Sequence, residues 1–119
     1  MTMLSGTRPL RKEAASENRA SLIAAYRRVR ERSHEICAPL ETEDYVIQTF
    51  QDVSPPKWHL AHTSWFFETF LLAPYEKDYA PFHPAFAYLF TADCETVGTF
   101  WPRRQRGLLA RPTVREVFD

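Results

Sequence analysis

The hydrophobic positions in the first third of the chain follow the period of an α-helix. From near Ser16, residues of one face recur at spacings of three and four. This stripe consists of Leu22, Tyr26, Val29, Ser33 and Ile36, widened by Ile23, Ala25 and Cys37. Charged residues fill the opposite side, as is typical of a solvated face. We predict a helix that begins at about residue 16 and stops before Pro39, after a flexible tail over residues 1–15.

A second helix is predicted over residues 55–72. Ser54 can cap its first turn, where proline is tolerated, and Pro74 should end it. The helical period places His62 at the centre of an aromatic face. Three residues of that face, Trp58, Trp65 and Phe66, are predicted to pack against other parts of the protein and so to have a structural role. The predicted polar stripe consists of Lys57, Ser64 and Glu68. Because the far side is also apolar, this helix requires cover on two sides.

The other segments are shorter and less regular. They are a connector over residues 39–53, a proline-containing crossover over residues 73–83, and a third helix over residues 85–97. Gly98 is well placed to end that third helix. After an irregular arginine-containing stretch, Thr113 and Glu116 form a capping box, which indicates a new helix. Since the chain stops at Asp119, we expect a domain that lacks its last helices.

Composition narrows the class of protein. A chain of 119 residues with 45% hydrophobic and 25% charged residues is typical of one globular domain. Fifteen basic and fifteen acidic residues cancel, so nothing indicates nucleic acid or an anionic membrane as a partner. No apolar run reaches the ~18 residues that span a bilayer. With three glycines and helical periodicity, the sequence predicts an all-α fold.

The cysteines, Cys37 and Cys94, match no zinc-binding spacing. Without a signal peptide, we expect a cytoplasmic protein in which both are reduced thiols.

His62 admits two interpretations. It can be a core histidine that is hydrogen-bonded to a backbone carbonyl. It can also be a metal ligand, because an imidazole in an aromatic pocket stays neutral, which is the form that binds a metal. His59 lies one turn away and could chelate the same ion. Two histidines alone make a poor site, so the sequence holds at most part of a coordination sphere.

Three segments carry a resemblance to a known family. Residues 54–70 (SPPKWHLAHTSWFFETF) resemble the second helix of EgtB-type sulfoxide synthases, which act in ergothioneine biosynthesis. Residues 39–45 (PLETEDY) with Gln48, and residues 106–113 (RGLLARPT), are similar to the same family. The resemblance implies that residues 16–119 are part of a DinB-like four-helix bundle.

The resemblance also implies a chemistry. Members of the family use a non-haem Fe(II) ion and O2 to join a thiol, γ-glutamylcysteine or cysteine, to Nα-trimethylhistidine as a sulfoxide. Three histidines hold the iron, and His62 matches the one on the second helix. The other two belong to an HxxxH-type motif on a fourth helix, and a C-terminal domain covers the site. Both are absent from this chain, so we expect an incomplete iron site and no activity alone.

The arginine-containing segment has two interpretations as well. Its charges can belong to a solvated loop, or they can bind substrate carboxylates with bidentate hydrogen bonds. The family uses arginines of this region for the thiol substrate. The candidates are Arg103, Arg104 and Arg106.

Two alternatives to the EgtB assignment stay open. One is a 5-histidylcysteine sulfoxide synthase of the ovothiol pathway, which uses free histidine. The other is a non-catalytic DinB-like module that binds a metal or another chain through its apolar faces. The sequence departs from the family at residues 89–94 (LFTADC) and 99–101 (TFW), which leaves the packing of that segment open.

Overall fold

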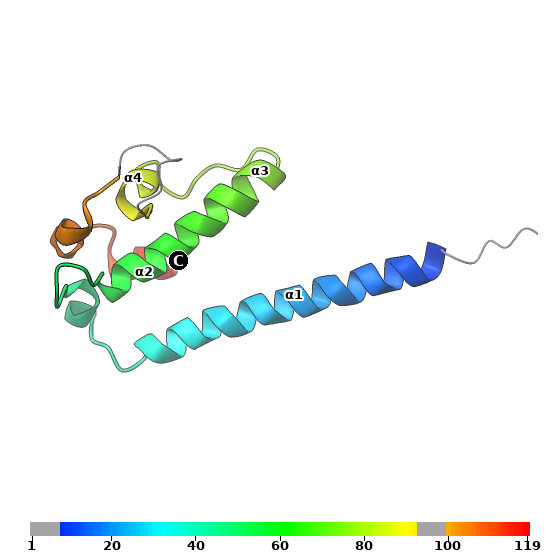
Figure 1. Ribbon diagram of the computed structural model, residues 1–119, viewed down its shortest axis with the longest axis horizontal. Coiled ribbons are helices and arrows are strands. Elements are labelled where there is room, and N and C mark those ends of the chain that lie inside the picture. The colour runs from blue at the N-terminus through cyan, green and yellow to red at the C-terminus, as the bar shows by residue number, and fades with distance from the viewer. Residues whose placement is uncertain (1–7, 93–99) are drawn as a thin grey trace, which may run out of the picture. The chain divides into compact units, whose positions relative to one another are not determined.

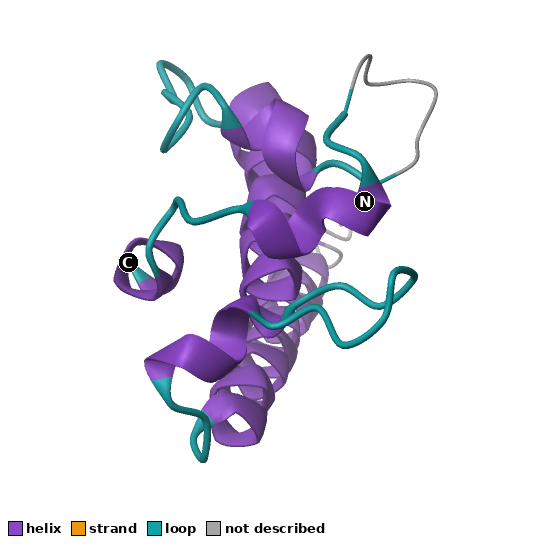
Figure 2. Ribbon diagram, turned by 90° about the vertical axis from the view of Figure 1, so that its left-hand side faces the viewer, coloured by secondary structure: helices purple, strands orange, loops and turns teal. Residues whose placement is uncertain are grey.

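The computed structural model describes residues 8–92 and 100–119, which are mostly helical. No strand occurs within these two ranges, so the predicted all-α class is confirmed for them (Figure 2). The chain forms two compact units, Met1–Ala38 and Pro39–Asp119. The boundary that we expected after residue 15 lies inside the first helix instead. Among the described residues, no helix is long and apolar enough to cross a membrane.

The first unit is built on helix α1, Arg8–Cys37. It begins well before Ser16, so the predicted tail is wrong from residue 8 onward, and residues 1–7 lie outside the described ranges. The residues that extend the helix are good helix formers: Lys12, Glu13, Ala14 and Ala15. The helix ends before Pro39, as predicted. Much of its apolar stripe is exposed, with Leu22 71%, Val29 67% and Ile36 61% accessible, whereas Cys37 at its end is buried.

The second unit is organised along one helical rod, which Figure 1 shows as a continuous ribbon. The rod consists of α2 (Pro56–Phe67), the π-helical turn η2 (Glu68–Leu72) and α3 (Ala73–Tyr75). It therefore runs past Pro74, where we predicted its end. In a regular α-helix the proline ring would clash with the carbonyl group of residue 70, and a wider π turn immediately before Pro74 relieves that clash.

Short elements from distant parts of the chain cover α2. It contacts the 3-10 turn η1 (Thr42–Val46) and the helices α4 (Phe86–Phe90) and α5 (Val114–Phe118). A second 3-10 turn, η3 (Arg103–Leu108), precedes α5. The buried hydrophobic residues of this unit are Tyr45, Trp58, Leu60, Ala61, Trp65, Phe86, Phe90 and Val117. The hydrophobic core therefore lies between α2 and the short segments that pack against it.

The third predicted helix is shorter than expected. α4 ends at Phe90 because Thr91 adopts an extended backbone (φ −69°, ψ 144°). The amide of Trp101 donates to the carbonyl oxygen of Tyr88 at 2.8 Å, which joins the next described segment to α4. The predicted stop at Gly98 and the residue Cys94 lie outside the described ranges.

The predicted capping box is confirmed at the start of α5. The amide of Glu116 donates to the hydroxyl oxygen of Thr113 at 3.2 Å, and the amide of Thr113 donates to the Glu116 carboxylate at 2.6 Å. This short helix is also packed, because Val117 is buried and the ring of Phe118 meets that of Tyr45 edge-on at 6.0 Å.

Candidate functional site: an aromatic stack around His62

The imidazole of His62 lies between two tryptophans of the same helix. The His62 and Trp58 rings are stacked, with centroids 4.6 Å apart and planes 10° apart. Trp65 lies one helical turn after His62. The centroids of the two rings are 5.5 Å apart, and their planes are inclined to each other by 27°. Spacings of four and three residues bring these side chains onto one face of α2, as the sequence predicted. The tryptophans therefore limit the rotation of the His62 ring.

A hydrogen bond fixes the orientation of that ring. His62 Nδ1 lies 2.5 Å from the backbone carbonyl oxygen of Phe90, at the end of α4. A carbonyl oxygen only accepts, so Nδ1 carries the proton, and the neutral ring keeps a lone pair on Nε2. This is the bond that the core-histidine interpretation predicted. It is equally the bond that orients histidine ligands in metal sites, so it leaves the metal interpretation open.

His62 has aromatic residues on both sides of it along the helix surface, as predicted, but only one of these sides is buried. On one side of it, the helix is covered by the rest of the unit. We call this side the buried arc, and its residues are Lys57, Trp58, Leu60, Ala61 and Trp65. On the other side the helix is accessible. We call it the exposed arc, and its residues are His59, Thr63 and Phe66. His62 itself is half-buried between the two arcs.

The helical period explains why Phe66 does not share the burial of the tryptophans. At ~100° per residue, Trp58 and Trp65 fall about 40–60° to one side of His62, and Phe66 falls about 40° to the other. Phe66 is 46% exposed and contacts the rings of Phe67 and Phe70 instead. Periodicity gave its angle correctly but could not tell which side would be covered.

Lys57 is buried rather than part of a polar stripe, which overturns that prediction. Its Nζ donates to the carbonyl oxygen of Leu109 at 2.7 Å. Burial lowers the pKa of Lys57, the nearby Arg111 lowers it further, and Glu116 acts in the opposite direction. The lysine therefore ties the start of α2 to the segment that follows η3.

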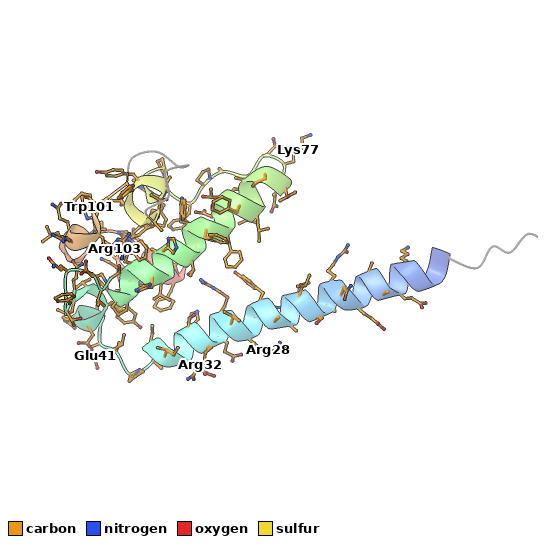
Figure 3. The ribbon with its side chains drawn as sticks, in the orientation of Figure 1. Arg28, Arg32, Glu41, Lys77, Trp101 and Arg103 are labelled. Carbon is orange, nitrogen blue, oxygen red and sulfur yellow. The ribbon has the colours of Figure 1, made fainter. Side chains whose placement is uncertain are left out.

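The three candidate arginines have different environments. Arg103 and Arg104 are exposed on η3, and Figure 3 shows Arg103 beside Trp101 near the N-terminal end of α2. Arg106 is buried instead. Its guanidinium carbon lies 3.5 Å from the ring centroid of Trp58, and its NH1 donates to the Ser54 hydroxyl at 2.8 Å. Arg106 therefore belongs to the stack, whereas the other two face solvent.

Gln48 holds η3 in place, a role that the sequence did not reveal. Its Nε2 donates to the carbonyl oxygen of Arg103 at 2.8 Å, and its Oε1 accepts from the amide of Gly107 at 2.9 Å. A Cβ atom on Gly107 would lie 2.8 Å from Gln48 Cβ, closer than carbon atoms approach, so this contact requires glycine. The contact joins two segments that resemble the same family.

His59 is exposed, and its ring meets that of Trp58 edge-on at 5.4 Å. Partial burial lowers the pKa of His59, and His62 and Arg106 lower it further, while a hydrogen bond that His59 donates to the backbone of Ser54 raises it. A lowered pKa keeps the imidazole neutral near pH 7.

The described residues supply one oriented imidazole rather than a complete metal site. Within residues 8–92 and 100–119, no group of three or more His, Cys, Asp or Glu side chains is arranged to hold an ion. His62 fits the role of a single ligand, because its free nitrogen is defined by the bond of the other. A comparison of the chain with models of known protein families and with curated proteins found no match.

Proposed function

We propose that this chain is the N-terminal, DinB-like helical part of an EgtB-type sulfoxide synthase, and that His62 is one ligand of its Fe(II) ion. The observation that carries the proposal is the bond between His62 Nδ1 and the Phe90 carbonyl oxygen. It leaves Nε2 as the ligand atom, on a ring that two tryptophans hold in place. The resemblance of residues 54–70 to the family supplies the reaction class.

The neighbouring exposed arc supports the same role. Further ligands have to approach His62 from a side that the unit does not already fill, and the exposed arc beside it is such a side. In this proposal, the two remaining histidines and a covering domain belong to parts of the protein beyond the chain described. When bound, an Fe(II) ion supplies open coordination positions for a thiol and for dioxygen.

The reaction balances without another reductant. A thiol S–H and an imidazole C–H are lost, and a C–S bond and an S=O bond form. One oxygen atom of O2 enters the sulfoxide, and the other leaves as water with the two hydrogens. In this scheme His62 orients the reacting centre, and the tryptophans exclude water from one side of it.

The arginines divide between two roles. Arg103 and Arg104 are exposed, so they can bind the carboxylates of a cysteine-type thiol. Arg106 keeps its guanidinium group with Ser54 and Trp58, so it holds η3 against α2 rather than clamping the substrate. Gln48 fixes the backbone on which Arg103 is presented.

Oxygen consumption tests the proposal on the product of the complete reading frame that encodes this chain. The protein is loaded anaerobically with Fe(II) and given γ-glutamylcysteine or cysteine together with Nα-trimethylhistidine. We expect O2 uptake and a sulfoxide product. His62→Ala should abolish both and lower the iron content, whereas His59→Ala, on the exposed arc, should retain iron.

Other outcomes separate the alternatives. Turnover with free histidine but not with trimethylhistidine would assign the ovothiol-pathway reaction. No O2 uptake with either, or iron binding that is unchanged in His62→Ala, would contradict the proposal and favour a non-catalytic module. For the 119-residue chain alone we expect weak metal binding that His62→Ala barely changes. Tight binding that this variant abolishes would contradict the incomplete site.

A further inference from the structure

A pocket separate from His62 lies where the π turn meets the crossover. Its cavity volume is about 170 Å³. Aromatic rings supply much of its wall, from Trp65 in α2, Tyr79 in the crossover and Phe86 in α4. Pro81 and Pro84 add apolar surface. The pocket therefore offers apolar walls of the kind that enclose small organic ligands.

One carboxylate stands in this apolar wall. Glu68 Oε1 accepts two hydrogen bonds, from the Tyr79 hydroxyl at 2.6 Å and from the Phe82 amide at 2.8 Å. Both bonds end on the same oxygen atom. Among the bonds of the described residues, none uses Oε2, so this atom can accept from a ligand. Both bonds also hold the carboxylate in place.

Two other polar side chains of the wall, Tyr79 and His83, take part in hydrogen bonds. The bond to Glu68 raises the pKa of Tyr79 to about 12, so its phenol stays a neutral donor. His83 Nδ1 accepts from the Ala85 amide at 3.1 Å. The described wall contains neither lysine nor arginine. A ligand in this pocket would therefore meet the carboxylate of Glu68 with no lysine or arginine of the described wall to neutralise it.

We infer that this pocket binds a small primary alkylammonium ion. Its N–H groups would donate to Glu68 Oε2, and its alkyl group would lie against the rings of Trp65 and Phe86. Aromatic faces attract cations as well, which adds to the pull of the carboxylate. An anion would meet an uncompensated carboxylate, and a neutral apolar molecule would leave Oε2 without its donor. Binding at this site requires no iron, so it can be tested independently of the proposed function.

A pair of probes that differ in charge tests the site on the full chain. Isobutylammonium chloride and isobutanol have similar shapes, and both can be titrated while the indole N–H signal of Trp65 is followed by NMR. NaCl keeps the ionic strength constant throughout. We expect a saturable shift with isobutylammonium and binding of isobutanol that is about tenfold weaker or more.

A matched pair of variants tests whether the charge that binds the ligand is that of Glu68. Glu68→Gln keeps the oxygen that accepts from Tyr79 and Phe82 but removes the charge, and it should weaken isobutylammonium binding about tenfold. Glu76→Gln removes an exposed carboxylate nearby and should change binding less than about twofold, because an exposed charge is screened.

Three results would overturn the inference. They are the absence of a saturable shift, equal affinity for the two probes, and equal effects of the two glutamate variants. Circular dichroism checks that each variant is folded. The comparison of the two probes uses the unmodified chain, so it remains decisive even where Glu68→Gln does not fold.

Discussion

The two arcs of α2 have similar residue types but opposite environments. Trp65 lies on the buried arc and Phe66 on the exposed arc, one residue apart in the sequence. A lysine of the buried arc is enclosed, whereas a histidine of the exposed arc reaches solvent. Hydrophobicity therefore does not decide which arc is covered. The covering segments decide it, through hydrogen bonds from α2 to distant backbone carbonyls at Leu89, Phe90 and Leu109.

Because His62 lies between the two arcs, it has a buried environment on one side and an accessible one on the other. Its Nδ1 side belongs to the packed interior, where the Phe90 carbonyl oxygen holds it. Its neighbours on the helix surface include the exposed residues His59, Thr63 and Phe66. An imidazole that the core orients and that lies next to accessible surface can bind a metal ion or another ligand, whereas one enclosed on all sides cannot be reached. Because its position is determined before binding, it loses little freedom when the ligand binds.

Replacement of one aromatic residue on each arc gives the largest expected difference. Trp65→Ala should lower the free energy of unfolding by ~3–5 kcal/mol, because it removes a large buried ring. Phe66→Ala should cost less than about 1 kcal/mol, because its ring is half exposed. Urea denaturation followed by circular dichroism measures both.

Trp65→Phe refines this comparison. The Trp65 Nε1 atom is buried and has no hydrogen-bond partner among the described residues, so the variant removes an unsatisfied donor while it keeps an aromatic ring. It should cost less than the alanine variant. Equal losses for Trp65→Ala and Phe66→Ala would show that the arcs are assigned wrongly.

The two lysines at opposite ends of the rod give a smaller expected difference. Lys57→Met should lower the free energy of unfolding by ~1–3 kcal/mol, because the carbonyl oxygen of Leu109 loses its part-buried donor. Lys77 is exposed beyond α3, as Figure 3 shows, so Lys77→Met should be nearly neutral. A neutral Lys57→Met would mean that this bond contributes nothing.

The pH dependence of stability distinguishes the same two lysines. The folded-state pKa of Lys57 is lowered below 10.5, mainly by burial and also by Arg111. Between that lowered value and 10.5, the unfolded chain binds more protons at this residue than the folded chain does. The free energy of unfolding should therefore rise with pH across this window. Lys57→Met should flatten the rise and Lys77→Met should not.

The smallest expected effect concerns His59 on the exposed arc. Burial, His62 and Arg106 hold its pKa below 6.5, so its NMR titration midpoint should lie below that value. Because the unfolded chain takes up this proton first, the contribution of His59 to stability should fall as pH drops below 6.5. Arg106→Gln removes a positive charge and should raise the midpoint. Arg104→Gln should leave it unchanged, and equal shifts would contradict a local effect.

Local signals in the sequence predicted much of the fold. Helical period located α2, Pro39 marked the end of α1, and Thr113 with Glu116 predicted the start of α5. These signals act between neighbours in the chain. They could not predict that Lys57 would be buried, or that Arg106 would lie against Trp58, because those contacts join residues about fifty positions apart.

The candidate site, like the fold, could be predicted only as far as it depends on residues close together in the sequence. The stacking of His62 with two tryptophans followed from their spacing, but its partner at Phe90 did not, because a carbonyl acceptor has no sequence signature. The start of α1 was misplaced because residues 12–15 favour helix without contributing to an apolar stripe.

The π turn of the rod has a consequence for how this protein tolerates insertions and deletions. A π turn holds one more residue than an α turn, so η2 is a place where the count of residues per turn changes along a single helix. Deletion of one residue there would tighten the turn and keep later side chains near their present directions. The same deletion within α2 would swing every following side chain by ~100°. A deletion at Glu68–Leu72 therefore keeps the later side chains in place, and its cost is the clash of the Pro74 ring with the carbonyl group of residue 70 that the wider turn now relieves.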